Sequence, residues 1–266
     1  MAKMSDIRTL TEELRQFVDD RGVDLLGIAP VSSYDGAEEQ MHPRYYIADA
    51  QSVIVLGLQV PKAIVDQVER RTTPYPYQRF AKTLLNDELD MLANQVSRFL
   101  VRQGYDCLPT PANDWRDPRT LKPVISHVLT AVAAGLGEVG WHNMLLTPQF
   151  GVRQKLVTIV TNAPLEPGHV YDGDPICDRC MRCVQECNIG AIADERTRSV
   201  TIDGKTFEWG ALRRLKCVWE CEGFTSQGTF SGGVGPYGRD MPFPTRTPTP
   251  EEICELQDMK PRWAVG

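Results

Sequence analysis

The chain has 266 residues, of which 42% are hydrophobic and 24% are charged, with a formal net charge of −6. This balance is typical of a globular protein and gives no indication of disorder. The 29 basic and 35 acidic residues leave no basic stripe, so nucleic acid is not expected as the main partner. Residues 1–6 carry no targeting signal, and the longest apolar stretch, residues 53–60, is too short for a membrane span. We therefore expect a cytoplasmic protein without a membrane partner.

Predicted helices and strands alternate over the first part of the chain. A capping box formed by Thr9 and Glu12 begins an amphipathic helix that ends near Gly22. Strands are expected at 23–29, 52–60, 105–108 and 156–161, and helices at 78–103 and 126–136. The apolar face of the long helix consists of Phe80, Leu84, Leu85, Leu89, Leu92, Val96 and Leu100. This order predicts a layered α/β domain over residues 1–168.

Four cysteines follow this domain in one short run. Cys177, Cys180, Cys183 and Cys187 are separated by gaps of two, two and three residues. Bacterial ferredoxins bind a 4Fe–4S cluster with this spacing. Zinc sites usually combine two separate short-gap hairpins, so consecutive gaps of two favour an iron–sulfur cluster over zinc. Residues 169–232 are therefore predicted to form a ferredoxin-like iron–sulfur module.

The number of cysteines leaves two ligand arrangements open. Cys217 and Cys221 are four residues apart on one face of a predicted helix and are the natural additional ligands. In one arrangement, a single cluster takes the first three cysteines of the run and either its fourth or one of this pair. In the other, two clusters share all six, completed by Cys254, Cys107 or a non-cysteine ligand. The pair is otherwise unexplained, which slightly favours two clusters, although Cys107 alone suits a buried core thiol.

Two further signals lie beyond the cysteine run. Asp203 and Gly204 occupy the centre of a hairpin pattern over residues 199–208, and residues 209–222 are expected to be helical. Residues 233–266 are predicted to form a tail rich in Pro and Gly. This tail contains a capped helix start at Thr249, where Pro250 occupies the first turn.

A glycine-rich segment precedes the cysteine run. It reads Ala134-Gly135-Leu136-Gly137-Glu138-Val139-Gly140-Trp141-His142-Asn143 and is followed by a short strand. In the order of these three features, the chain resembles epoxyqueuosine reductases and reductive dehalogenases over most of residues 10–225. The resemblance implies a nitroreductase-like α/β domain that holds a cobalamin, with an iron–sulfur module docked against it. A low-potential donor of the ferredoxin or flavodoxin type would then reduce the cobalamin through the clusters, for reaction with a small-molecule substrate.

The same segment supplies the candidate site residues. Glycines let the backbone approach a bulky ligand closely and leave N–H groups free to donate, whereas the alternative is a turn packed for steric reasons alone. The predicted cofactor contacts are Ser126, Gly135, Gly137, Gly140 and Asn143. His127 and His142 flank the segment and are the first candidates for proton donors, although lone histidines more often have a structural role.

The chain departs from the resembled family at one catalytic position. Leu121, beside Lys122, stands where epoxyqueuosine reductases carry a catalytic aspartate, and leucine cannot donate a proton. This argues against epoxyqueuosine as the substrate. We therefore expect an iron–sulfur reductase that acts on a small organic molecule. The alternatives are an electron-transfer or corrinoid-reducing protein without its own substrate, and a redox sensor with a structural cluster.

Overall fold

The computed structural model describes residues 4–69, 76–113 and 123–221, and residues 245, 246, 249 and 252. Its centre is an antiparallel sheet with the strand order β1-β2-β6-β3. The strands are β1 (Leu25–Pro30), β2 (Ser52–Gln59), β6 (Gln154–Thr161) and β3 (Cys107–Pro109). The inner strands β2 and β6 are buried over almost their whole length, which suits their runs of Val, Ile and Leu. The predicted mixed α/β fold is confirmed.

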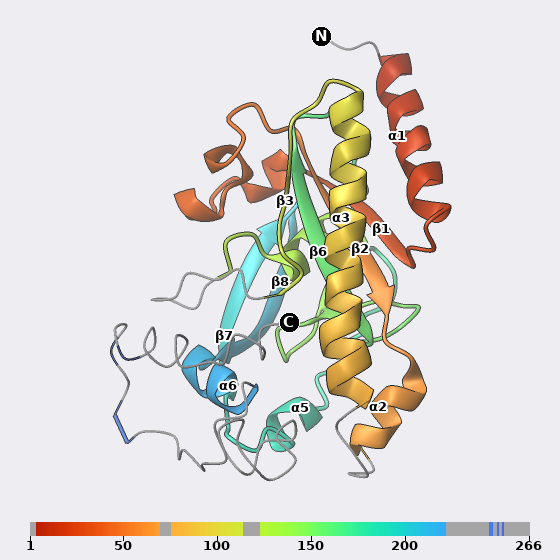
Figure 1. Cartoon of the computed structure of the whole chain (residues 1–266). Coiled ribbons are helices and arrows are strands. Elements are labelled where there is room, and N and C mark those ends of the chain that lie inside the picture. The colour runs from red at the N-terminus through yellow and green to blue at the C-terminus, as the bar shows by residue number, and fades with distance from the viewer. Residues whose placement is uncertain are drawn as a thin grey trace.

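Helices α1 (Met4–Asp19) and α3 (Leu85–Arg102) cover one face of this sheet. In Figure 1, α3 runs across the front of β2 and β6, and α1 lies beside it. The apolar stripes of both helices pack on the sheet in one core cluster. Its largest fully buried side chains are Leu14, Ile28, Ile54, Leu56, Leu89, Leu100 and Ile159.

The first helix begins earlier than predicted. It starts at Met4, so the capping box expected at Thr9 is wrong. Thr11 lies inside the helix instead, where its hydroxyl donates to the carbonyl of Ile7 at 2.8 Å. The same hydroxyl accepts from the backbone N–H of Glu166 at 2.9 Å, which ties α1 to the segment after β6.

The long helix is preceded by a π-helix over Tyr77–Leu84. A π-helix closes its hydrogen bonds from i to i+5, so its side chains leave the 3.6-residue period of the following α-helix. Phe80 and Leu84 are consequently 53% and 36% exposed, and their predicted place in the core is wrong. The remaining predicted core positions of α3 are buried or pack against the core.

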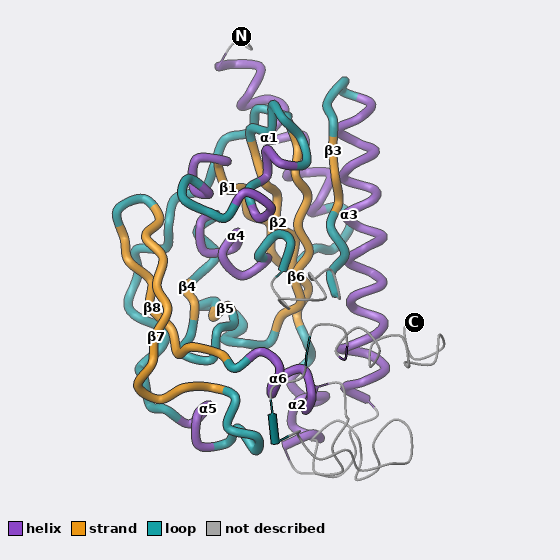
Figure 2. The backbone as a smooth tube through the Cα atoms, turned by 90° about the vertical axis from the view of Figure 1, so that its left-hand side faces the viewer, coloured by secondary structure: helices purple, strands orange, loops and turns teal. Residues whose placement is uncertain are grey.

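The opposite face of the sheet carries helix α4 (His127–Ala133) and the hairpin of β4 (Glu138–Val139) and β5 (Leu145–Leu146). Figure 2 shows α4 on the side of the sheet away from α3, with β7 and β8 farther out. A second core cluster joins Val55 of the sheet and Val132 of α4 to Phe207 of the outer hairpin. This cluster connects the α/β layers to the cysteine-containing segment.

The outer hairpin consists of β7 (Ile192–Ile202) and β8 (Lys205–Leu212). The predicted turn is confirmed, since Asp203 and Gly204 both have positive φ, 49° and 77°. The helix expected from residue 209 is wrong at its start, because the strand continues to Leu212, which pairs with Ile192. Helix α6 (Arg214–Cys221) follows, and the short helix α5 (Arg182–Gln185) precedes the hairpin.

The connecting segments are mostly short turns. Residues 31–45 contain the 3-10 turns Val31–Tyr34, Glu39–Met41 and Pro43–Tyr45. Helix α2 (Lys62–Glu69) comes shortly after the end of β2 in the chain. None of the helices that the structure describes is long and apolar enough to span a bilayer.

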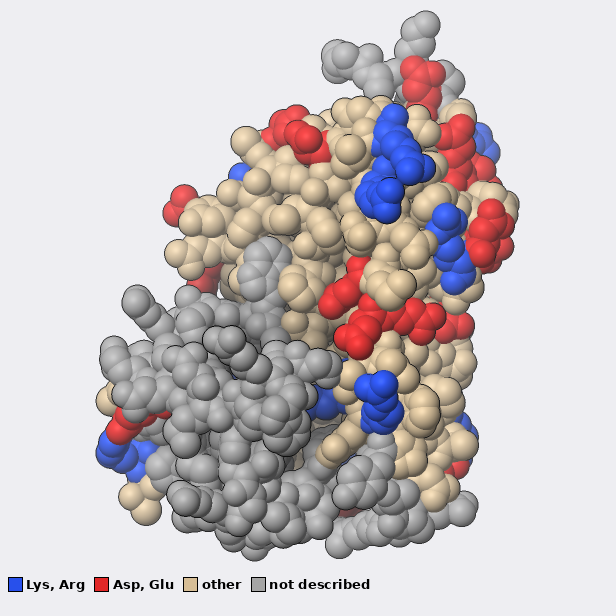
Figure 3. Space-filling view, in the orientation of Figure 1, with Lys and Arg blue, Asp and Glu red and all other residues tan. Residues whose placement is uncertain are grey.

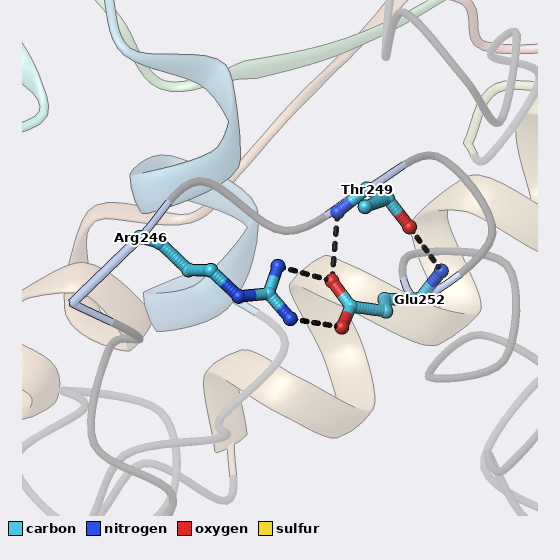
Figure 4. Close-up of polar contacts among 3 residues, drawn as sticks. All are labelled: Arg246, Thr249 and Glu252. Carbon is cyan, nitrogen blue, oxygen red and sulfur yellow. Dashed lines mark hydrogen bonds and ion pairs between the residues drawn. The ribbon is translucent and has the colours of Figure 1, made fainter.

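Thr249 and Glu252, where a capped helix start is predicted, are joined by hydrogen bonds (Figure 4). The Glu252 carboxylate accepts from the N–H of Thr249 at 2.8 Å, and the Thr249 hydroxyl accepts from the N–H of Glu252 at 3.3 Å. These reciprocal bonds define a capping box. Arg246 also pairs with the same carboxylate, and these contacts lower the pKa of Glu252 to about 2.

Candidate iron–sulfur site

The backbone of the cysteine run is tightly wound. Arg179 and Met181 both adopt positive φ, 54° and 57°, although neither is glycine. Such conformations concentrate at functional sites because the local structure must compensate their strain. Met181 is left-handed and is followed directly by helical Arg182. This pairing forms a nest, in which successive N–H groups point toward one concave side, a geometry used at iron–sulfur sites.

The thiol of Cys183 is affected by two other cysteines of the run. Burial is the main reason that the pKa of Cys183 is raised, and charges on Cys177 and Cys180 raise it further. Cys180 is exposed, while the other two are half-buried. In the described part of the chain, however, no three His, Cys, Asp or Glu side chains are arranged as metal ligands. The ligand set of the three cysteines therefore stays a prediction.

Cys187 and Cys217 belong to adjoining segments. The sulfur of Cys187 accepts a hydrogen bond from the N–H of Ala191 at 3.2 Å. The start of α6 is tied to the same segment, because the guanidinium of Arg213 donates to the carbonyl of Gly190 at 2.8 Å. The N–H of Cys217 in turn donates to the carbonyl of Arg213 at 3.1 Å. The two-cluster arrangement requires such proximity, but the side chain of Cys221 and all of Cys254 lie outside the described residues.

A carboxylate of the glycine-rich segment holds the start of the cysteine loop. One oxygen, Oε1 of Glu138 in β4, accepts from the N–H of Ile176 at 2.8 Å and from that of Cys177 at 2.5 Å. Bonds from N–H groups to a carboxylate are stronger than those to a neutral acceptor. Sequence reasoning missed Glu138, because nothing in its spacing predicts an acceptor for residues nearly forty positions away.

The neighbouring Trp141 docks the outer hairpin onto the core. Its side chain is 5% exposed, and its indole N–H donates to the carbonyl of Ala193 at 2.9 Å. Its own carbonyl accepts from the N–H of Gly210 at 3.0 Å. A Cβ at Gly210 would lie 2.6 Å from the indole nitrogen, so only glycine permits this approach. The guanidinium of Arg179 lies 5.3 Å from the centre of the ring, within range of a cation–π contact.

A Trp141→Phe substitution tests this docking. It retains most of the packing but leaves the buried carbonyl of Ala193 without its donor, so we expect a loss of about 1 to 2 kcal/mol in unfolding free energy. Urea unfolding followed by circular dichroism measures the change. Trp209→Phe, at a half-buried position in β8, is the matched control and should cost less. Equal losses in the two variants would contradict the assigned role of the indole N–H.

The predicted cofactor glycines pack against the chain itself. A Cβ on Gly135 would lie 1.9 Å from the carbonyl oxygen of His169, and one on Gly137 would lie 2.0 Å from that of Leu146. A Cβ on Gly140 would meet the ring of His142 at 2.7 Å. Steric packing therefore explains why glycine occupies these positions. This is the alternative to a cofactor loop that the sequence left open. Contact of the glycines with a corrinoid stays a prediction.

His127 is held by hydrogen bonds at both ring nitrogens. Its Nε2 lies 3.1 Å from the carbonyl of Pro111 and its Nδ1 lies 3.1 Å from the hydroxyl of Thr158. A carbonyl only accepts, so Nε2 carries a proton and donates to Pro111. Ser126 acts as N-cap of α4, accepting from the N–H of Leu129 at 3.2 Å. Both residues therefore have structural bonds, and their catalytic or cofactor roles stay predictions.

His142 lies in the loop of the β4–β5 hairpin. Burial lowers its pKa, so the ring is neutral near pH 7. Nδ1 accepts from the N–H of Met144 at 3.1 Å, which leaves the ring proton on Nε2. Asn143 has a φ of 64°, the left-handed position typical of three-residue hairpin loops. The structure thus brings His142 and Asn143 together at one tip, apart from His127 at the start of α4. Leu121 and Lys122 lie outside the described residues.

Known proteins resemble the chain in sequence and in fold. The epoxyqueuosine reductase of Listeria monocytogenes is 26% identical over 59% of this chain and 40% of its own length. The tetrachloroethene reductive dehalogenase of Sulfurospirillum multivorans is 27% identical over 64% of this chain and 30% of its own length. No protein-family model matches. The chain is a homologue of epoxyqueuosine reductases and reductive dehalogenases. It spans less than half the length of these two relatives, which are redox enzymes by name.

Solved structures share the fold of this family. A reductive dehalogenase described as suggesting a mechanism for B12-dependent dehalogenation matches 99% of this chain and 36% of its own, with a TM-score of 0.59 at 17% identity. An epoxyqueuosine reductase matches 69% of this chain and 52% of its own, with a TM-score of 0.51 at 19% identity. The likeness supports the mixed α/β fold; the ferredoxin-like form of residues 169–232 stays a prediction.

The exclusion of nucleic acid as a partner is overturned by one of these relatives. That epoxyqueuosine reductase was solved with a tRNA stem loop that carries the epoxyqueuosine modification. The exclusion was wrong because a net charge sums over the whole chain and does not describe a local surface. On the face drawn in Figure 3, the described Lys and Arg side chains form small groups among acidic ones, despite the net charge of −6.

Proposed function

We propose that the chain is an iron–sulfur oxidoreductase whose Cys177, Cys180 and Cys183 hold a 4Fe–4S cluster with one further cysteine. The spacing of these three cysteines on a nest-forming loop carries the proposal. The donor set fits the group, because thiolates are the usual ligands of such clusters and nests orient N–H groups toward their sulfur atoms. The reductase and dehalogenase relatives support a redox enzyme.

A second set of ligands completes the proposal. Cys187 and Cys217, carried by adjoining segments, would form it together with Cys221 and a fourth ligand. A 4Fe–4S cluster supplies one-electron transfer at low potential when it is bound. The exposed Cys180 lies where an electron donor of the ferredoxin or flavodoxin type would approach.

We also propose cobalamin as a second cofactor. The support is the B12-dependent dehalogenase among the structural neighbours, together with the resemblance of the glycine-rich segment. At Gly135 and Gly137 the chain's own carbonyls fill the space that a ligand would need, so these glycines add no support. The proposed substrate is a small organic molecule. The tRNA-bound neighbour makes a modified tRNA stem loop the second substrate class to test.

Metal analysis after strictly anaerobic purification tests the proposed function. We expect about four or about eight iron atoms per chain with equal sulfide, and cobalt retained after incubation with hydroxocobalamin and gel filtration. Zinc in place of iron would contradict the cluster. Iron without retained cobalamin would contradict the second cofactor and favour an electron-transfer protein that has no substrate of its own. Turnover of model halides and of the tRNA stem loop then separates the two substrate classes.

A further inference from the structure

One carboxylate links the core of the protein to the first cysteine of the cluster loop. Both hydrogen bonds to Oε1 of Glu138 come from main-chain N–H groups, those of Ile176 and Cys177. Glu138 is therefore the only side chain that these two hydrogen bonds require, since the loop contributes main-chain groups. Glu138 is half-buried, so water competes weakly for these bonds and their electrostatic strength increases.

The backbone that carries this carboxylate is held on both sides. Glu138 pairs with Leu146 across the β4–β5 hairpin. The preceding Gly137 approaches the carbonyl of Leu146 so closely that no Cβ fits, and the following Val139 is 5% exposed in the core. A side chain on such a rigid hairpin can hold a loop in place without moving itself. The main chain at Cys177 is thereby fixed relative to the core.

Arg179, a cation of the cysteine loop, has another partner. Arg179 pairs with Glu208 of β8 at 3.0 Å, and its guanidinium lies over Trp141. The carboxylate of Glu138 instead binds two neutral N–H groups, so its negative charge is not cancelled by these contacts. A charge fixed this close to a ligand sulfur acts on the reduction potential of a cluster, as do N–H groups that bond to the sulfur atoms.

We infer that Glu138 is a positioning residue for the cluster, which fixes the main chain at Cys177 and lowers the cluster's reduction potential. The inference rests on the proposed function. The negative charge disfavours the added electron. The two N–H groups that bind Glu138 are also not free to donate to the sulfur atoms of a cluster, where such bonds would raise the potential. Both effects therefore have the same sign.

Two variants separate position from charge. Glu138→Gln keeps an oxygen acceptor for both N–H groups but removes the charge, so we expect iron content equal to that of the wild type and a more positive midpoint potential in a redox titration. Glu138→Ala removes the acceptor as well, so we expect iron loss to a chelator to be several-fold faster. Amide hydrogen exchange of the peptide with Ile176 and Cys177 should also be faster. Glu195→Gln, an exposed carboxylate in β7, is the charge-matched control and should leave all three measurements unchanged.

The outcomes distinguish this inference from the function on which it rests. A wild-type chain that takes up no iron and sulfide would overturn both. A wild-type chain that binds a cluster, with a midpoint potential unchanged in Glu138→Gln and unchanged iron loss in Glu138→Ala, would overturn the inference alone. A shift in Glu195→Gln as large as that in Glu138→Gln would overturn it too, because the effect would then reflect net charge rather than the contact with the loop.

Discussion

Replacement of Cys180 by serine is expected to abolish the visible absorption of the proposed cluster and to reduce bound iron to a small fraction of the wild-type value. Cys180 is the second cysteine of the run and is exposed, so a hydroxyl in its place disturbs no packing. The loss therefore reports on ligation. We also expect a less stable cysteine segment, because the energy of metal binding is part of the folding energy of such a site. Absorption spectra and iron analysis of anaerobically reconstituted protein measure the effect.

Cys107→Ser is the matched control for this prediction. Cys107 is half-buried in β3, where its thiol donates to the hydroxyl of Thr161 at 3.3 Å. Serine can make the same bond, and burial raises the pKa of the Cys107 thiol, which disfavours the thiolate that iron requires. We expect this variant to keep its iron and spectrum. A Cys180→Ser variant with a normal spectrum, or a Cys107→Ser variant without one, would contradict the ligand assignment.

Gly137→Ala is expected to lower the unfolding free energy by roughly 2 to 4 kcal/mol. The added Cβ would lie 2.0 Å from the carbonyl oxygen of Leu146, and neither backbone can move without disturbing the hairpin. The resemblance assigns Gly137 to the corrinoid site. In the structure, its close contact with Leu146 also fixes the backbone of the next residue, Glu138, which binds the cysteine loop. We therefore expect bound iron to fall as well. Thermal unfolding and iron analysis of the same preparation measure both effects.

Gly151→Ala is the control for Gly137→Ala. It measures the loss of unfolding free energy when a Cβ is added at a glycine where no atom lies close. Gly151 has a φ of 60°, and a Cβ there would meet nothing within 4 Å. The expected loss is thus only the left-handed backbone strain of about 1 kcal/mol, with iron binding unchanged. If Gly137→Ala were no more destabilising than Gly151→Ala, the close approach to Leu146 would not be a constraint in solution.

The strands and helices could be predicted largely from the periodicity of apolar residues. Val53, Ile54, Val55 and Leu56 form a β-branched and apolar run that favours a buried strand, and β2 is an inner strand of the sheet. The prediction failed where local geometry changes the period. The π-helix before α3 exposes Phe80 and Leu84, because sequence spacing assumes α-helical turns throughout.

By itself, the sequence determined the chemistry available to this protein. Cys177, Cys180 and Cys183 supply soft thiolate ligands. The gaps of two residues between them require that all three lie on one short loop. Only the tertiary structure decided what holds that loop. Glu138 and Trp141 bind backbone groups of Cys177 and Ala193, and a backbone N–H or carbonyl is the same at every residue. Such contacts leave no sequence pattern, so they become visible only when the β4–β5 hairpin and the cysteine segment are brought together in space.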